Sequence, residues 1–505
     1  SVGSSSTRRT TSRPKGLQTV PTANPGIWCC RRESRFSPPE ARSDCCSHSS
    51  RTETAVFSRI RKRPYRKLNI PPGEPLIPSS VLRQRLREPA RYRECIVRLY
   101  GKKRRWPDVV DGDVSVRQLF QGQRKAARLL ARAVDRGSYQ AQPAVRNAVS
   151  ADKLRLVHRF SAPDLVVHGV MAAALTEILE DVLPESVYSY RRGRSAVHAL
   201  RGFAGFVREH RRELDDPRQR GLLVLRADVR DYGDSIPVDD ASPLWPMLRG
   251  VLGGEPATVL RDAIRPIVEV AGARARLDVG LATGSPLATA VSNLYLLPVD
   301  RALDGLRGGF YARFGDDMLF AHPDPTVFHG AIELMNDELS RLGLQLKAKK
   351  YRELFFNGAG RPGPHGRWAG ASRVSYLGAE VGFDGSLRLA PQKVRELRSS
   401  LRQRIHSSCR LLWRVPVEQR GRAVCAAVAR ALQPGTRISS PHVGHLRGVV
   451  DDRRQLAELD RWLAQAVASA VVGRKGPRAF RQASPRRLRE WGLPSLVAAR
   501  NRGRS

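Results

Sequence analysis

The stretch from 310 to 321, FYARFGDDMLFA, constrains the fold of this chain more than any other part of the sequence. Apolar residues lead up to Gly315-Asp316-Asp317 and resume at Met318. This pattern predicts two short strands joined by a tight turn, because Gly and Asp tolerate the positive φ of such turns. A solvated acidic turn is the simplest explanation of an isolated Asp-Asp pair. Two like charges at a hairpin tip repel each other, however, unless a cation lies between them.

The charge balance of the chain points to a polyanionic partner. Its 505 residues carry 88 Lys and Arg against 48 Asp and Glu, a formal net charge of +40, which is typical of proteins that bind nucleic acid. An anionic membrane is the competing interpretation. No apolar run approaches the roughly 18–20 residues of a spanning helix, so we expect no membrane partner. The seven cysteines lack the spacing of a disulfide framework, which favours a reduced, cytoplasmic setting.

Residues 1–75 are predicted to be a disordered basic tail. Within 1–70, 15 Lys and Arg accompany four acidic residues, and apolar periodicity is absent. An organelle transit peptide is an alternative for this Arg- and Ser-rich start. The tail also holds four cysteines and a histidine that could ligate zinc, but the usual two-residue gap within a cysteine pair is missing, so unbound thiols fit better. These residues are Cys29, Cys30, Cys45, Cys46 and His48.

Residues 76–150 are predicted to be a helical N-terminal extension, because apolar residues recur there at three-to-four spacing with Arg on the opposite face. Beyond it, Asp164 is placed to act as the N-cap of an apolar helix over 165–183. The segment 188–196, YSYRRGRSA, then places arginines around a glycine. That composition suits a triphosphate or a nucleic-acid backbone.

Two further motifs carry polar residues beside apolar runs. Leu222–Leu225 is predicted to be a buried strand that leads into an acidic cluster, with Asp228 held rigidly at the strand end. The segment 280–295, GLATGSPLATAVSNLY, begins with a Gly/Ser/Pro turn and continues as a helix of small residues. Such a backbone lets a ligand approach closely.

In this order the motifs resemble those of reverse transcriptases, specifically the bacterial group II intron-like branch. A strand-end Asp begins the first palm motif of that family, and Asp228 matches it. The Gly-x-x-x-Gly-Ser-Pro-Leu motif with its later Asn is matched between Gly280 and Asn293, and the Tyr/Phe-x-Asp-Asp hairpin by 314–317. The resemblance covers about 150–400. The remaining motifs are the fingers pair Arg155 and Asp164, the two segments 190–195 and 342–350, and the primer-grip turn at 374–378.

The resemblance implies an α+β fold, a right-hand fingers–palm–thumb polymerase with an antiparallel palm sheet and a helical thumb. It places the fingers and palm at 151–385 and a basic helical thumb with a C-terminal extension at 386–505. The implied activity is RNA-directed DNA synthesis. Its expected partners are an RNA template, a DNA or RNA primer and deoxynucleoside triphosphates, and the basic surface also suits a structured RNA.

The resemblance also assigns roles to individual residues. Asp228, Asp316 and Asp317 are the expected catalytic carboxylates and would bind two Mg²⁺ ions, since hard oxygen ligands suit that ion. The expected nucleotide-binding residues are Lys153, Arg155, Arg194, Tyr232, Gly233, Gly284 and Lys350, although template or backbone binding is nearly as good a role for the first three. The expected primer and template contacts are Asn293, Tyr376, Leu377 and Gly378.

Gly233 departs from the resembled family, which usually has a bulky aromatic residue five positions after the first catalytic Asp. An open position there would weaken discrimination against ribonucleotides, whereas a displaced Tyr232 or a bulge at Gly233 would restore an aromatic gate. Together with Thr283 and Asp234, which also depart from the family's pattern, Gly233 suggests a divergent branch, and no recognisable endonuclease follows the polymerase motifs. Two other functions stay open: a defence-associated polymerase that works without a coding template, and a non-catalytic RNA-binding protein.

Overall fold

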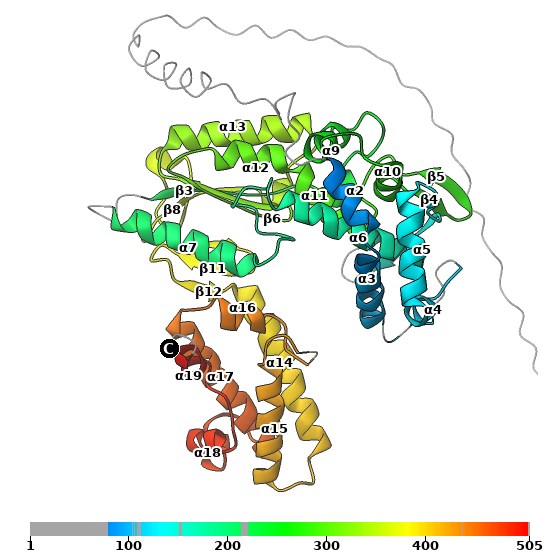
Figure 1. Cartoon of the computed structure of the whole chain (residues 1–505). Helices are drawn as coiled ribbons and strands as arrows, with labels where there is room; N and C mark the ends of the chain where they lie inside the picture. Colours follow the sequence, from blue (N-terminus) through cyan, green and yellow to red (C-terminus); the bar gives the residue numbers. More distant parts are fainter. Residues whose placement is uncertain are drawn as a thin grey trace, which may run out of the picture. The chain divides into compact units, whose positions relative to one another are not determined.

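The computed structural model describes residues 79–103, 105, 107–108, 113–150, 154–213, 221–436 and 438–502 (Figure 1). These residues belong to one unit, Leu68–Ser505. The predicted tail over 1–75, with its candidate zinc ligands, lies outside the described residues.

A five-stranded sheet forms the centre of this unit, with the strand order β6-β7-β3-β8-β9 (Figure 1). The strands are β3 (Leu222–Asp228), β6 (Phe310–Phe314), β7 (Asp317–His322), β8 (Arg352–Phe356) and β9 (Ala369–Ala371). The first four strands in spatial order pair antiparallel, as predicted. The prediction is wrong for β9, which runs parallel to β8, because the long connection over 357–368 brings the chain back in the same direction.

Both faces of the central sheet are buried, which explains why β3 is a continuous apolar run. Leu223 and Leu225 join the main core, whereas Leu222 and Val224 pack in a second cluster with α7 (Ala196–Arg212). The main core also contains residues of several further helices. These are α6 (Ala162–Leu179), α8 (Tyr232–Ser235), α9 (Leu244–Leu252), α10 (Thr258–Ile264), α11 (Leu287–Tyr295), α12 (Leu297–Asp304) and α13 (Pro325–Arg341).

Helices occupy the predicted N-terminal extension only as far as Asp135. They are α2 (Ser79–Arg87), α3 (Pro89–Lys102), α4 (Val116–Gln121) and α5 (Gln123–Asp135). The prediction of helix up to residue 150 is wrong, because Ala144–Ser150 forms strand β1. This segment gains backbone partners in a four-stranded sheet of order β2-β1-β4-β5, which no local pattern reveals. The other strands are β2 (Leu154–Arg159), β4 (Ile267–Val270) and β5 (Ala273–Arg276).

The apolar helix α6 begins earlier than predicted. Ser161 is its N-cap, since the Ser161 hydroxyl accepts a hydrogen bond from the Asp164 amide, so the prediction of Asp164 as the cap is wrong. The expectation that no apolar run approaches a spanning length is also wrong for α6, which is 18 residues long and apolar enough by composition. Because 67% of α6 is buried inside the fold, its apolar character is that of a core helix.

The C-terminal part begins with a three-stranded sheet of order β10-β11-β12 and continues as helices. The strands are β10 (Arg373–Tyr376), β11 (Ala379–Gly382) and β12 (Leu387–Leu389), and the helices are α14 (Pro391–Leu411), α15 (Val417–Ala431), α16 (Val443–Gly448), α17 (Arg453–Val472), α18 (Pro485–Glu490) and α19 (Leu496–Arg502). A separate apolar core, including Leu401, Val428 and Leu463, holds these helices together as a C-terminal bundle. Short 3-10 turns occur at Ala348–Lys350 (η1), Pro364–Gly366 (η2) and Gly476–Arg481 (η3).

Candidate active site

The predicted Asp-Asp hairpin is present and lies beside the end of β3. Gly315 and Asp316 form the turn between β6 and β7, and the φ of Gly315 is +68°. Asp228 pairs directly with Asp317 across β3 and β7. The Val229 amide donates to the carbonyl of Asp316 at 3.4 Å. The sheet register therefore brings three carboxylates from two separate segments to one end of the central sheet.

Asp228 is a buried carboxylate with one unsatisfied oxygen. The residue is 2% exposed, and its Oδ2 accepts a hydrogen bond from Nζ of Lys350. Its Oδ1 is buried without a hydrogen-bond partner in the described part of the chain. Lys350, predicted to bind the nucleotide, thus pairs with the candidate catalytic Asp in this structure. An unpaired buried oxygen is costly, and a bound cation would satisfy it.

The pKa values of three groups beside Asp228 are shifted. Burial, and then the charge of Asp228, raises the pKa of Asp316. Burial also raises the pKa of Asp317, although the Lys350 ammonium opposes that change. Burial lowers the pKa of Lys350, but its hydrogen bond to Asp228 and the other carboxylates outweigh that effect, so the pKa is raised. Excess negative charge thus collects at this end of the sheet and favours a cation.

The three carboxylates do not form a complete metal cage by themselves. Among the described residues, no three His, Cys, Asp or Glu side chains are grouped closely enough to hold a metal ion. Asp317 instead lies 3.8 Å from Arg226, so the prediction of one site with all three aspartates is not confirmed. The donors still fit Mg²⁺, because this ion usually takes only one or two protein carboxylates and completes its shell with water and substrate phosphates.

A buried ion pair supports the Asp-Asp turn from inside the fold. Arg313 is 1% exposed and donates to both carboxylate oxygens of Asp300, at 2.7 and 2.6 Å. It also donates to the Gly315 carbonyl in the turn, at 3.1 Å. Burial disfavours the charged guanidinium, but the Asp300 charge and hydrogen bonds outweigh this and raise the pKa of Arg313. Sequence reasoning missed this pair, although an Arg within an apolar strand is a usable signal.

Asn293, predicted to contact primer or template, belongs to the same buried network. It is 2% exposed, and its side-chain oxygen accepts from Arg313 at 3.1 Å and from the Ser189 hydroxyl at 3.0 Å. Its amide nitrogen donates to the Ser189 carbonyl at 2.8 Å. The predicted nucleic-acid contact is therefore wrong in this structure. Asn293 instead joins α11 to the strand that carries the Asp-Asp turn.

Tyr376 is likewise buried rather than presented to nucleic acid. Its ring is 1% exposed, and its hydroxyl lies 3.2 Å from the Ala312 carbonyl and 3.4 Å from the Asp317 carbonyl. The prediction of a direct primer or template contact is wrong for this side chain, which supports β6 and β7 from the second face of the sheet. Leu377 and Gly378 form the tight β10–β11 turn, with φ values of +46° and +80°, and remain partly exposed.

The loop after Asp228 leaves open space at Gly233. A Cβ atom added there would meet no atom within 4 Å. Gly233 lies in the short helix α8 and does not form a bulge. Tyr232 is 7% exposed, and its hydroxyl donates to the Ser292 carbonyl at 2.5 Å. The sequence left two alternatives at Gly233: an empty position, or an aromatic gate restored by Tyr232 or by a bulge. The structure favours the empty position.

Position 284 requires glycine because the backbone of β2 lies directly against it. Its φ is +119°, and an added Cβ would lie 2.2 Å from the His158 carbonyl of β2. The His158 amide also donates to the Thr283 carbonyl at 2.7 Å. The Leu281 amide donates to the Gly233 carbonyl at 2.7 Å. The turn over 280–284 therefore connects β2 to the loop that follows Asp228.

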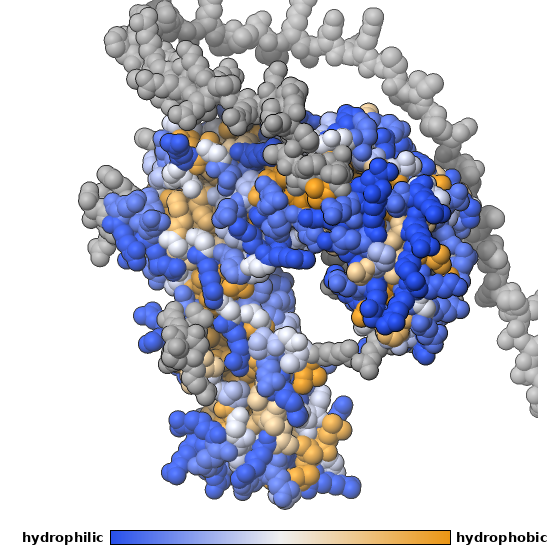
Figure 2. Space-filling view, in the orientation of Figure 1, coloured by the Kyte–Doolittle hydropathy of each residue, from blue (hydrophilic) through white to orange (hydrophobic). Residues whose placement is uncertain are grey.

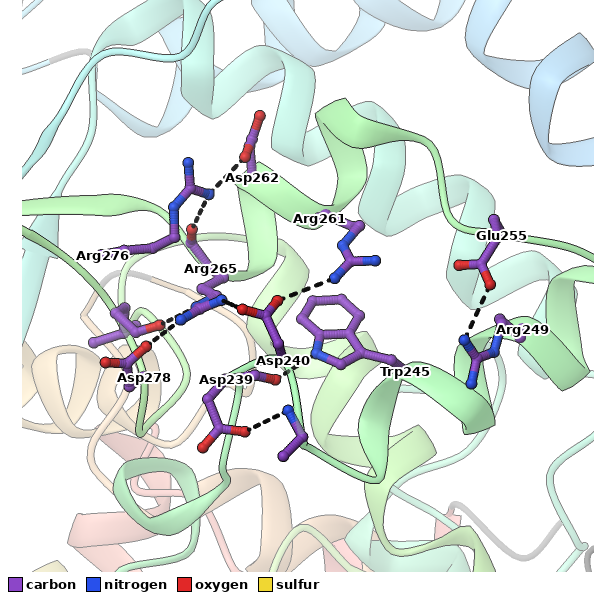
Figure 3. A network of polar contacts seen from close by, with 12 residues as sticks. Asp239, Asp240, Trp245, Arg249, Glu255, Arg261, Asp262, Arg265, Arg276 and Asp278 are labelled. Atoms are coloured by element: carbon purple, nitrogen blue, oxygen red, sulfur yellow. Dashed lines mark hydrogen bonds and ion pairs between the residues drawn. The ribbon is translucent and has the colours of Figure 1, made fainter.

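A surface network of ion pairs stabilises the segment that follows α8 (Figure 3). Arg265 binds Asp240 and Asp278, and Arg261 also reaches Asp240, at 3.3 Å (Figure 3). The Arg261 guanidinium stacks on the ring of Trp245, 4.7 Å from its centroid. Because the Val238 amide donates to the Asp278 carbonyl, the network holds the segment after α8 beside the segment before the 280–284 turn.

Of the three predicted nucleotide ligands Lys153, Arg155 and Arg194, the structure describes the side chain of Arg194 alone. Arg194 is bound to Glu185, with a 3.1 Å ion pair, and its guanidinium lies 5.8 Å from the centre of the Tyr188 ring. Lys153 lies outside the described residues, and only the backbone of Arg155, in strand β2, is described. The structure therefore leaves these three roles as predictions.

Residues 151–381 match the family model of the reverse transcriptase (RNA-dependent DNA polymerase). The search of curated proteins gives no match.

Two solved structures of telomerase are among the similar folds. Apo telomerase from Candida tropicalis, truncated from the C-terminal domain, is 10% identical with a TM-score of 0.37, over 49% of this chain and 56% of that one. Telomerase from Candida albicans, in complex with the TWJ fragment of telomeric RNA, is 10% identical with a TM-score of 0.39, over 72% of this chain and 62% of that one. The chain thus spans less than two thirds of either telomerase. The family match and the sheet that carries Asp228 and the Asp316-Asp317 turn together show that residues 151–381 form a reverse transcriptase domain.

Proposed function

We propose that this protein is an RNA-directed DNA polymerase that extends a primer by two-metal phosphoryl transfer. The observation that carries the proposal is the pairing of β3 with β7, which places Asp228, with its unsatisfied buried oxygen, beside the Asp316-Asp317 turn. In this proposal the sheet β2-β1-β4-β5 corresponds to fingers, the central sheet to the palm and the C-terminal bundle to the thumb. The order of the motifs favours the group II intron-like branch.

The protein groups have distinct parts in the proposed reaction. Asp228 and Asp316 would hold two Mg²⁺ ions, with Asp317 as the third carboxylate. When bound, Mg²⁺ supplies charge neutralisation for the phosphates and activation of the primer hydroxyl. Lys350 is the cation paired with Asp228 in the described structure. Its side chain is 44% exposed, so the ammonium can move from Asp228 toward an incoming triphosphate.

The proposed partners are an RNA template, a primer and deoxynucleoside triphosphates. Residues 391–505 contain 25 Lys and Arg against seven Asp and Glu, and this charge suits the phosphates of a duplex. Figure 2 shows hydrophilic residues over most of the visible face of the described chain, with apolar residues in smaller patches. A non-catalytic RNA-binding protein would gain nothing from the mutual repulsion of three neighbouring carboxylates, so the carboxylate cluster favours an enzyme.

The decisive experiment compares the wild type with Asp228→Asn and Asp316→Asn in primer extension on an RNA template with Mg²⁺. Both variants should lose extension by at least about a thousandfold, because each removes a charged metal ligand, while RNA affinity stays within a few-fold. Extension on a template should also follow its sequence, which separates this function from a polymerase that uses no coding template. Active variants would overturn the metal assignment, and an inactive wild type that binds RNA tightly would favour the RNA-binding protein.

A further inference from the structure

Lys350 has a fixed place beside Asp228, because the chain segments that carry the two residues are joined by backbone hydrogen bonds. The Lys347 amide donates to the Asp228 carbonyl at 2.8 Å, and the Arg230 amide donates to the Gln345 carbonyl at 2.7 Å. In the 3-10 turn η1 the Lys350 amide then donates to the Lys347 carbonyl at 2.8 Å. The position of Lys350 next to Asp228 is therefore set by backbone contacts that involve neither side chain.

The ion pair joins a buried carboxylate to an accessible cation. The Lys350 ammonium donates to Oδ2 of Asp228, whose other oxygen has no partner in the described part of the chain. The charges of Asp316 and Asp317 also attract this ammonium. The Asp228 side chain is 2% exposed, whereas the Lys350 side chain is 44% exposed. Asp228 is thus fixed in the core, while the Lys350 ammonium can leave it.

A metal ion at Asp228 and the Lys350 ammonium would compete for one carboxylate. Like charges repel most strongly where water is excluded, so the two cations disfavour each other there. The ammonium does not leave freely either, because a buried carboxylate that loses its partner is left uncompensated. One cation therefore replaces the other, and the replacement is favoured when another anion accepts the ammonium. The triphosphate of a nucleotide is such an anion.

We propose that Lys350 makes metal binding at Asp228 depend on the nucleotide, because its ammonium occupies the carboxylate until a nucleoside triphosphate accepts it. Coupling between two ligands is reciprocal, so a bound metal ion raises the affinity for the triphosphate by the same factor. The inference rests on the proposed polymerase function, which brings both ligands to one site. It gives Lys350 a positioning role that precedes the chemical step.

The first test measures the affinity of the full-length protein for Mn²⁺, without nucleic acid, from the electron paramagnetic resonance of the free ion. Lys350→Gln retains a hydrogen-bond donor but removes the charge. It should bind Mn²⁺ about tenfold more tightly than the wild type, which is within the usual range of coupling between sites. Lys349→Gln is the matched control, because it removes the same charge from the neighbouring exposed residue. It should change the affinity by less than about twofold, since exposed charges are screened.

Asp228→Asn shows where the effect arises. In this background Lys350→Gln should no longer strengthen Mn²⁺ binding, because the carboxylate for which the two cations compete has been removed.

The second test adds the chromium(III) complex of dTTP. Its metal does not exchange, so the added Mn²⁺ reports on the protein site and not on the nucleotide. The complex should raise the Mn²⁺ affinity of the wild type about tenfold, because the triphosphate accepts the Lys350 ammonium. It should raise that of Lys350→Gln by less than about threefold, since no ammonium remains to be released.

Three results would overturn the inference: a wild type whose Mn²⁺ affinity the complex leaves unchanged, equal Mn²⁺ affinities of Lys350→Gln and Lys349→Gln, or a gain from Lys350→Gln that persists beside Asp228→Asn. The first of these needs no variant, so the proposal stays testable even if Lys350→Gln does not fold. None of the measurements depends on catalysis. The expected coupling without primer extension would overturn the proposed polymerase function and leave the role of Lys350 standing, and extension without coupling would do the reverse.

Discussion

Burial of the Asp316 carboxyl disfavours its charged form. Burial and the charge of Asp228 raise its pKa, so the folded protein binds this proton more readily than the unfolded chain does. The stability that this group contributes is fully present below its unfolded pKa and is lost as the pH rises through the folded value. At neutral pH and without metal, Asp316 is therefore a destabilising residue.

We expect Asp316→Asn to raise the free energy of unfolding of the metal-free protein at neutral pH, because the amide carries no charge that burial disfavours. The gain should shrink as the pH falls through the raised pKa of Asp316. Denaturant unfolding in a chelator at neutral and acidic pH measures this. Added Mg²⁺ should stabilise the wild type more than the variant. A variant that is less stable than the wild type at neutral pH would contradict the account.

Gly233 is the residue at which the proposed choice of sugar is decided. Because an added Cβ meets open space and the Tyr232 hydroxyl is bound to Ser292, no described side chain takes the place of the missing aromatic group. We expect the wild type to discriminate weakly against ribonucleotides and Gly233→Phe to discriminate at least about tenfold more strongly, by steric exclusion of the 2′-hydroxyl.

Incorporation of deoxynucleotides and ribonucleotides by both proteins, in single-turnover assays, measures this effect. Gly233→Ala serves as the control, since a methyl group is too small to form a gate. If the wild type already rejects ribonucleotides as strongly as Gly233→Phe, the open position has no role in selection, and Tyr232 becomes the residue to test.

At the scale of elements, the 280–284 turn is the connection between β2 and the carboxylate loop. Gly284 makes this connection possible because its backbone approaches the His158 carbonyl too closely for any side chain. We expect Gly284→Ala to lower the free energy of unfolding by about 2–3 kcal/mol, through both steric contact and an unfavourable φ. Gly233→Ala should change it by less than about 1 kcal/mol, because that site is open and helical.

Denaturant unfolding of the two alanine variants provides the comparison. The displacement of β2 in Gly284→Ala should also reduce primer extension while the affinity for duplex RNA stays near that of the wild type. Equal stability of the two variants would show that β2 and the turn can separate without cost, in contradiction to the close contact.

At the scale of the whole molecule, the net charge of +40 is distributed over parts with different proposed roles. Residues 1–70 contain 15 Lys and Arg but lie outside the described structure and the matched residues 151–381. We expect removal of 1–70 to lower the log–log salt slope of RNA binding, by about 0.7–0.9 for each RNA phosphate that the tail binds, while extension on short templates is preserved. Loss of folding in the truncated protein, judged by circular dichroism, would show that these residues are structural.

The features that the sequence by itself determined are local ones. The Asp-Asp hairpin followed from apolar residues on both sides of Gly315, and the strand that ends at Asp228 followed from its continuous apolar run. Turn chemistry and apolar periodicity act over a few residues, so they can be recognised without knowing the partners of a segment. The same patterns, with the order of the motifs, were sufficient to indicate the reverse transcriptase domain.

The tertiary structure decided which side chains face the site and which support it. Asn293 and Tyr376 carry polar groups that suit nucleic acid, yet both are buried because Arg313 and the Asp317 carbonyl lie beside them in the fold. The strand β1 and the parallel pair β8–β9 likewise depend on backbone partners that are distant in sequence. Burial and pairing are properties of neighbours in space, and for this reason the pairing of Arg313 with Asp300 became visible only in the folded chain.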